Sequence, residues 1–263
     1  MTTSFPAAER RTALGAHRVR SLHHGAQAAE GPHDPGLVVL LPGLGLPGYT
    51  LPTAAAIASR GVECAVLDVP GYGSSEPRSS RPTIDAIGSV AAQWILQEAA
   101  NRPVVVLGHS TGAQAALTSA LGLQTHRRRL ALVLAGPTFR PEHRRVLRLI
   151  AATPFAYRDD RLAEIDIMEV LRARSDLVRL VASGLRDVPE DRVAGLFAPL
   201  SVMAGEHDSY APPGWLSLLA ASAVGSAVVR TSIIGGSHNN LYTHPDEVAD
   251  VALIALEDAV AWP

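Results

Sequence analysis

The stretch VVVLGHSTGAQAAL, residues 104–117, passes from an apolar run of valines into Gly-His-Ser-Thr-Gly and then into an alanine-rich segment. Apolar β-branched runs of this length are typical of a buried strand, and alanine-rich segments are typical of a helix. Ser110 therefore lies where a strand becomes a helix, with Gly108 two residues before it and Gly112 two residues after it. So sharp a connection leaves no room for larger side chains at the two glycine positions.

The Gly-His-Ser-Thr-Gly pattern in this setting predicts a nucleophile elbow. Such a turn raises the serine hydroxyl above the carboxyl edge of a sheet. It also sets the backbone N–H of Thr111 at a helix N-terminus, where that N–H can stabilise negative charge. A random chain of this length can contain the same five-residue pattern, so the flanking strand and helix give the prediction its weight. We expect His109 to pack or hydrogen-bond within the elbow rather than to act as a base.

Apolar runs and helical segments alternate along most of the chain. One or two strands are expected within residues 12–24, and single strands at 37–43, 62–70, 103–108, 130–136, 198–205 and 227–234. Helices are expected near 53–60 and across 84–100, 112–122, 214–223 and 247–260, and residues 26–36 are expected to form a loop. Buried strands that alternate with helices indicate an α/β fold with a mostly parallel sheet and helices on both faces.

The alternation is interrupted between residues 139 and 197. Arginines and acidic residues crowd this stretch, and its apolar positions recur at helical spacing, as in VLRLIAA at 146–152. We interpret residues 139–197 as a helical insertion, called here the lid segment. Residues 1–138 and 198–263 are then expected to form the core domain.

The composition excludes several classes of protein. A chain of 263 residues, 47% of them hydrophobic, can bury a substantial core. The formal net charge of −2 offers no attraction for nucleic acid or an anionic membrane, so neither is an expected partner. All 23 basic residues are arginines, and the absence of lysine excludes pyridoxal phosphate chemistry and a Walker-type lysine. Cys64 is expected to be a buried structural thiol. The N-terminus lacks the apolar region of a signal peptide and no apolar run approaches 18 residues, so we expect a cytoplasmic protein.

From about Leu37 to the C-terminus the chain resembles the α/β-hydrolase superfamily, whose fold implies an eight-stranded sheet. The sequence LPGLG at residues 41–45 is similar to the family's His-Gly oxyanion loop, with Pro42 in place of the histidine. In that family the residue after the dipeptide lends a backbone N–H, and here it is Leu44. The sequence DVPGYGSS at residues 68–75 resembles the family's D-x-P-G-x-G-x-S turn, which concerns folding rather than chemistry.

The serine needs a base and an acid to become a good nucleophile. The family's acid follows the strand after the lid, where Asp208 matches the G-x-x-D pattern and Glu206 is a rival two residues earlier. The histidine follows the last strand, where His238 lies in Gly-Ser-His and His244 is a rival. The order Ser110, Asp208, His238 is the one expected for this fold.

Other residues give weaker signals. An apolar substrate pocket could be lined by the lid residues Phe155, Tyr157, Ile165, Met168 and Leu171, although each could equally seal the lid onto the sheet. His17, His23, His24 and His33 are expected on a solvated surface. No HExxH or Cys/His spacing suggests a metal ligand set, so no metal is expected.

The resemblance and the candidate residues imply covalent acyl transfer that requires no cofactor. His238 would take the proton of Ser110, Asp208 would orient the imidazole, and the backbone amides of Leu44 and Thr111 would bind the oxyanion. The expected partner is a small-molecule substrate. The first expectation is hydrolysis of a carboxylic ester or lactone in a substrate that is apolar and of small to medium size. Hydrolysis of a C–C bond or a thioester, and a non-catalytic ligand-binding member of the fold, remain alternatives. Epoxide hydrolase and dehalogenase chemistry would need an aspartate where Ser110 stands.

Overall fold

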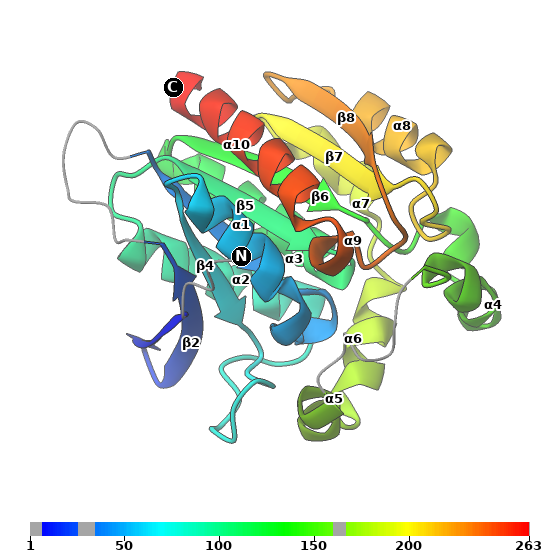
Figure 1. The fold of residues 1–263 in the computed structure, drawn as a ribbon, viewed down its shortest axis with the longest axis horizontal. Helices are drawn as coiled ribbons and strands as arrows, with labels where there is room; N and C mark the ends of the chain where they lie inside the picture. The colour runs from blue at the N-terminus through cyan, green and yellow to red at the C-terminus, as the bar shows by residue number, and fades with distance from the viewer. Residues whose placement is uncertain (1–6, 26–34, 160–166, 263) are drawn as a thin grey trace.

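The computed structural model describes residues 7–25, 35–159 and 167–262, and these contain one eight-stranded sheet (Figure 1). The strands are β1 (Ala8–Leu14), β2 (His17–His24), β3 (Leu37–Leu41), β4 (Glu63–Asp68), β5 (Val104–His109), β6 (Leu130–Ala135), β7 (Leu200–Gly205) and β8 (Val229–Ile234). Their order is β1-β2-β4-β3-β5-β6-β7-β8. The six strands from β3 to β8 pair in parallel, whereas β1 and β2 form an antiparallel hairpin and β2 also pairs antiparallel with β4.

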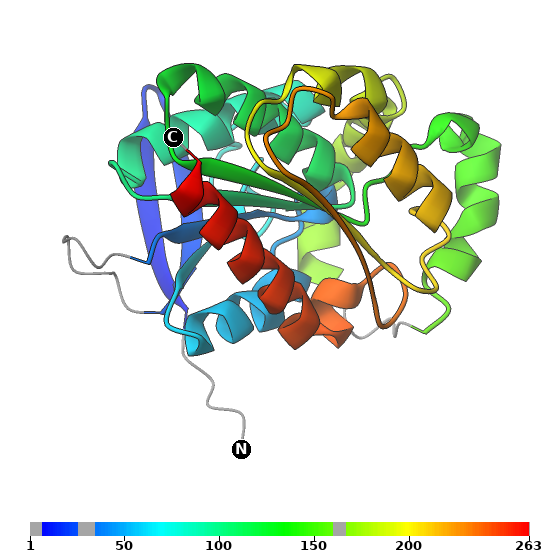
Figure 2. The same ribbon diagram turned by 90° about the horizontal axis from the view of Figure 1, so that it is seen from above.

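Helices cover both faces of the sheet (Figure 2). The α-helices are α1 (Leu51–Ser59), α2 (Ile84–Glu98), α3 (Thr111–Leu123), α4 (Val146–Ala156), α5 (Ile167–Ala173), α6 (Asp176–Gly184), α7 (Pro189–Arg192), α8 (Pro213–Ser222), α9 (Asn240–Thr243) and α10 (Pro245–Ala261). Short 3-10 turns lie at Gly43–Gly45, Gly48–Thr50, Gln124–His126, Pro141–His143 and Val193–Gly195. One apolar cluster joins α2, α3 and α8 to one face of the sheet, and a second cluster joins α1 and α10 to the other face.

The central strands have the continuous apolar character that a sheet covered on both faces requires. Every residue of β3, β5, β6 and β7 is buried. Neighbouring side chains of a strand point to opposite faces, and so Val38 and Leu40 join one cluster while Val39 and Leu41 join the other. The predicted α/β fold with a mostly parallel, eight-stranded sheet is confirmed.

The start of the chain differs from the prediction in detail. Residues 12–24 were expected to hold one or two strands, and they hold β2 and most of β1, which begins upstream at Ala8. β2 pairs with β1 on one side and with β4 on the other, and within it His23 and His24 are buried at 4% and 5% exposure. The expectation that these two histidines are solvated is wrong, whereas His17 is exposed. His33 and most of the predicted loop at 26–36 lie outside the described residues.

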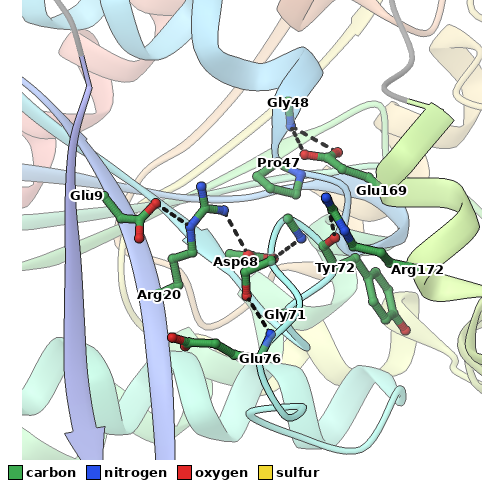
Figure 3. A network of polar contacts seen from close by, with 12 residues as sticks. Glu9, Arg20, Pro47, Gly48, Asp68, Gly71, Tyr72, Glu76, Glu169 and Arg172 are labelled. Atoms are coloured by element: carbon green, nitrogen blue, oxygen red, sulfur yellow. Dashed lines mark hydrogen bonds and ion pairs between the residues drawn. The ribbon is translucent and has the colours of Figure 1, made fainter.

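The described parts of the lid segment contain helices and connecting turns, and its helices α4, α5 and α6 lie at one side of the molecule (Figure 1). A carboxylate on α5 joins the lid segment to the core, because Glu169 accepts the backbone N–H of Gly48 at 3.1 and 3.2 Å (Figure 3). Glu169 is buried at 6% exposure. That the lid segment is a separate domain with the boundaries given above stays a prediction.

Asp68, the last residue of β4, contacts both the turn that follows it and the hairpin of β1 and β2 (Figure 3). Asp68 accepts the backbone N–H of Gly73 at 3.1 Å and pairs with Arg20 of β2 at 3.0 Å, and Arg20 also pairs with Glu9. These contacts hold the turn in shape and agree with a folding role for it. Within the ranges that the structure describes, no helix is both long and apolar enough to cross a bilayer.

Candidate active site

Ser110 occupies a strained turn between β5 and α3. Its backbone has φ of 57° and ψ of −124°, in a region that residues other than glycine rarely adopt. A Cβ atom on Gly108 would lie 2.2 Å from the carbonyl oxygen of Gly112, and one on Gly112 would lie 2.2 Å from that of Leu41. Both glycines are therefore required by close backbone approach, as the sequence pattern indicates.

Three side chains that are far apart in the chain form one hydrogen-bonded series. The Nε2 atom of His238 lies 3.0 Å from Oγ of Ser110, and its Nδ1 atom lies 2.8 Å from Oδ2 of Asp208. A carboxylate accepts only, so Nδ1 carries the proton and Nε2 is free to accept from the serine hydroxyl. The side chains of His238 and Asp208 are fully buried, and Ser110 is 8% exposed.

The surroundings of Asp208 keep its carboxylate ionised. Oδ1 accepts the backbone N–H groups of Tyr210 at 2.8 Å and Ala211 at 3.2 Å, while Oδ2 faces His238. Burial raises the pKa of Asp208, but His238 and the Tyr210 amide lower it more, so the net pKa lies below its ordinary value. The carboxylate is thus available to orient the imidazole and to stabilise its cation.

Aromatic rings enclose the imidazole of His238. Tyr157 and Tyr210 meet it edge to face, with ring centroids at 5.3 and 4.9 Å, and the His109 ring lies at 4.8 Å. The backbone N–H of His238 donates to the carbonyl of Ala156 in the lid segment at 2.8 Å. These contacts hold the ring in one place and limit the access of water to it.

The two rival residues lie away from this series. Glu206 is exposed, and His244 bonds to the hydroxyl of its neighbour Thr243 at 2.9 Å. Within the described part of the chain, neither residue hydrogen-bonds to Ser110 or His238, whereas Asp208 and His238 are joined to the serine as described above. Geometry therefore favours Asp208 and His238 over their rivals.

The two residues expected to bind an oxyanion contact each other. The N–H of Leu44 donates to Oγ1 of Thr111 at 2.6 Å, and Leu44 has a left-handed backbone with φ of 53°. Thr111 is the first residue of α3, so its own backbone N–H points out of the helix N-terminus. Both residues lie beside the serine, and an oxyanion role for their amides stays a prediction.

The residues expected to line a pocket differ in exposure. Phe155, Met168 and Leu171 are 66%, 52% and 57% exposed, whereas Tyr157 is half-buried against His238. Ile165 lies outside the described residues. Among the described members of this set, Tyr157 packs against His238 of the three-residue series.

Sequence reasoning missed two further residues at the site, Tyr49 and Tyr210. Tyr49 Oη lies 2.6 Å from Nδ1 of His109, and Tyr210 packs against His238. Neither belongs to a motif, although Tyr210 stands two residues after Asp208. Among the described residues, no cluster of His, Cys, Asp or Glu is arranged to hold a metal ion.

A profile of the alpha/beta hydrolase family matches residues 38–251, and the chain belongs to this family. Solved structures share the fold at low sequence identity. An enol-lactonase from Burkholderia xenovorans LB400 gives a TM-score of 0.70 at 17% identity, covering 94% of this chain and 100% of that chain. A thermophilic esterase from Thermogutta terrifontis gives 0.69 at 18%, covering 96% and 98%.

A soluble variant of monoglyceride lipase from Saccharomyces cerevisiae, in complex with a substrate analogue, gives a TM-score of 0.70 at 15% identity and covers 98% of this chain and 97% of that chain. No curated protein matches the sequence. The family and these neighbours support a hydrolase of this fold.

Proposed function

We propose that the protein is a serine hydrolase that cleaves a carboxylic ester or lactone of small to medium apolar character through an acyl-enzyme. The observation that carries this proposal is the unbroken series Ser110 Oγ, His238 and Asp208, with contacts of 3.0 and 2.8 Å. The names of the neighbours, an enol-lactonase, an esterase and a monoglyceride lipase, agree with ester and lactone chemistry.

In the first half-reaction a bond forms between Ser110 Oγ and the carbonyl carbon, while Nε2 of His238 takes the hydroxyl proton. The tetrahedral oxyanion then accepts the backbone N–H of Thr111 and that of Leu44, which exchanges its bond to the Thr111 hydroxyl for one to the substrate. Collapse of the tetrahedral intermediate breaks the bond between the acyl carbon and the alkoxy oxygen of the ester. His238 gives its proton to the leaving alkoxide.

In the second half-reaction water attacks the acyl carbon and gives its proton to His238. The carboxylic acid leaves, and the proton returns to Ser110. Asp208 keeps Nδ1 of His238 protonated throughout and stabilises the imidazolium form. Each step uses only side chains, backbone amides and water, so this chemistry requires no cofactor.

The apolar character of the substrate is inferred from the lid segment. Leu44 and Tyr49 of the core, and Val170 and Leu177 of α5 and α6, all pack against one small apolar cluster. Its buried members are Leu46, Tyr72 and Ala173, so apolar side chains of the core and the lid segment meet there. An ester with apolar acyl and alcohol groups would remove such surface from water, at about 25 cal/mol for each Å² buried.

The test treats the folded protein with a fluorophosphonate probe and with p-nitrophenyl esters of increasing acyl length. We expect labelling of Ser110, located by peptide mass spectrometry, and turnover of the shorter esters. Ser110→Ala should abolish labelling and lower kcat by about 10⁶, as loss of the nucleophile does in a serine protease. A folded wild type that is neither labelled nor active would favour a non-catalytic ligand-binding role. Full activity in Ser110→Ala would show that another residue is the nucleophile.

A further inference from the structure

Three consecutive hydrogen bonds connect the backbone at Gly43 to the backbone at His238. The backbone N–H of Gly43 lies 2.7 Å from Oη of Tyr49, which lies 2.6 Å from Nδ1 of His109. The Nε2 atom of His109 in turn lies 2.8 Å from the backbone carbonyl oxygen of His238. We propose that Tyr49 and His109 are positioning residues. They hold the loop that carries Leu44 and the loop that carries His238 in place relative to Ser110. This inference rests on the proposed function.

The direction of every bond in the series is determined by its ends. The carbonyl of His238 can only accept, so Nε2 of His109 carries a proton, and Nδ1 of the neutral ring is then an acceptor. Tyr49 must therefore donate its hydroxyl proton to His109, and its oxygen accepts the N–H of Gly43. For a neutral ring, no other arrangement of protons satisfies all three contacts.

The electrostatic surroundings keep both side chains neutral. Burial, and then the neighbouring His238, lowers the pKa of His109 to about 3. Burial raises the pKa of Tyr49. The series therefore persists unchanged across the pH range in which a histidine base of ordinary pKa would titrate, and His109 does not compete with His238 for the serine proton.

The first end of the series controls the loop that carries Leu44. Gly43 is packed so closely that a Cβ atom on it would lie 2.8 Å from Cβ of Ser110 and 2.8 Å from Oη of Tyr49. The next residue is Leu44, whose backbone is held at a positive φ. A loop released from Tyr49 would shift the Leu44 amide relative to the serine.

The other end controls the loop that carries the base. The backbone of His238 is held on one side by His109 and on the other by the carbonyl of Ala156 in the lid segment. Loss of the His109 contact leaves the lid contact alone, so the imidazole can drift from Ser110. A misplacement of about 1 Å at a reacting group can cost on the order of 10²-fold in rate.

The experiment compares Tyr49→Phe, His109→Leu and His109→Gln with wild type. Tyr49→Phe breaks the bonds to Gly43 and to His109, and His109→Leu breaks the bonds to Tyr49 and to the carbonyl of His238. A glutamine amide separates its oxygen and nitrogen much as the ring separates its two nitrogens, so His109→Gln can accept from Tyr49 and donate to His238. Tyr72→Phe is the matched control, because the Tyr72 hydroxyl is buried without a hydrogen-bond partner in the same apolar cluster as Leu44 and Tyr49.

We expect kcat on a p-nitrophenyl ester to fall about 10- to 100-fold in Tyr49→Phe and His109→Leu, with KM within about twofold of wild type. His109→Gln should recover most of the loss, and Tyr72→Phe should resemble wild type. The series is overturned if Tyr49→Phe and His109→Leu keep wild-type kcat when folded. It is also overturned if His109→Gln is as impaired as His109→Leu, because the ring's volume rather than its bonds would then matter.

A second measurement is independent of turnover. Side-chain ¹⁵N NMR of wild type should show His109 as the neutral tautomer protonated at Nε2 at pH 7, and in Tyr49→Phe the His238 signals should also shift. If wild type is inactive and unlabelled, the proposed function fails, and these signals alone decide the series. A His109 protonated at Nδ1, or His238 signals unchanged by Tyr49→Phe, would overturn it.

Discussion

Two hydrogen-bonded series among the described residues run from a serine through a histidine to a carboxylate, and they differ in backbone, access and charge. The first joins Ser110, His238 and Asp208 beyond the carboxyl ends of the parallel strands. The second lies between β2 and the start of β4, where Oγ of Ser21 is 2.9 Å from Nε2 of His23 and Nδ1 of His23 is 2.8 Å from Oε1 of Glu63. Each carboxylate requires a proton on Nδ1, so the two histidines share one tautomer.

The two serines differ in backbone and in access. Ser110 stands in a strained turn at a helix N-terminus, with 8% exposure and backbone amides beside it. Ser21 lies in a strand that pairs on both sides, opposite Arg10 and Leu67, and it has no exposure. A carbonyl group cannot reach Ser21, and the neighbouring strands already use the backbone donors that could bind an oxyanion.

The two carboxylates also differ in their partners. Asp208 accepts neutral backbone N–H groups, so its charge remains to stabilise a histidine cation. Glu63 pairs with Arg102 at 2.7 Å and with Arg10 at 3.7 Å, so arginines already balance its charge. Three residue types in the right order are therefore insufficient for the proposed nucleophilic chemistry. That chemistry also needs the strained turn, backbone amides beside the serine and a carboxylate whose charge no arginine balances.

The largest effect that separates the two series is expected for Asp208→Asn. Oδ1 of Asp208 faces two backbone N–H groups, so the amide oxygen of asparagine should take that place and present its NH₂ group to Nδ1 of His238. The imidazole would then be protonated on Nε2 and unable to accept from Ser110. We expect a loss in kcat on the order of 10⁴ with unchanged folding, as in a serine protease triad.

The control for this change is Glu206→Gln, at the exposed rival acid, which should keep wild-type kcat. Steady-state kinetics and a circular dichroism melt on both variants decide the assignment. Normal turnover in Asp208→Asn, or a large loss in Glu206→Gln, would mean that Asp208 is not the orienting acid.

The next effect concerns stability, and it is expected for Glu63→Gln. The substitution removes the charge that balances the largely buried Arg102, so unfolding free energy should fall by about 3 kcal/mol at pH 7. Turnover per folded molecule should not change, because this series has no part in the reaction. Urea unfolding measures the free energy of unfolding, and steady-state hydrolysis of a p-nitrophenyl ester, divided by the concentration of folded protein, measures the turnover.

The pH dependence of that loss has a definite sign. Burial raises the pKa of Glu63, but the bonds from His23 and Arg102 lower it more, so its folded pKa lies below the ordinary value. Glu63 therefore stabilises the fold above its unfolded pKa, and this contribution is lost as the pH falls through the folded pKa. The difference between wild type and Glu63→Gln should be largest above about pH 5 and shrink below it. A difference that grows as the solution becomes more acidic contradicts this account.

The comparison of the two series also shows which features of the fold and the site could be predicted from the sequence. The elbow around Ser110 is local, since two glycines, a strand and a helix specify it within a short stretch, whereas the resemblance to the family pointed to Asp208 and His238. The burial of His23 depends on a pairing between β2 and β4, about 40 residues apart, that no local pattern reveals. The exposed positions of Phe155 and Met168 depend on how the lid helices dock, and their apolar spacing alone does not determine which face packs inward.

The smallest effect is expected when the serine of the second series is truncated. Ser21→Ala leaves Nε2 of His23 buried without its donor, which should cost about 1 to 2 kcal/mol of unfolding free energy. Ser119→Ala is the matched control, because the Ser119 hydroxyl is fully buried without a hydrogen-bond partner. Both variants should be labelled by the fluorophosphonate probe at the wild-type rate, in contrast to Ser110→Ala. If Ser21→Ala loses no more stability than Ser119→Ala, the bond to His23 adds nothing to the fold. If it loses labelling while folded, the two series are coupled and the distinction between them fails.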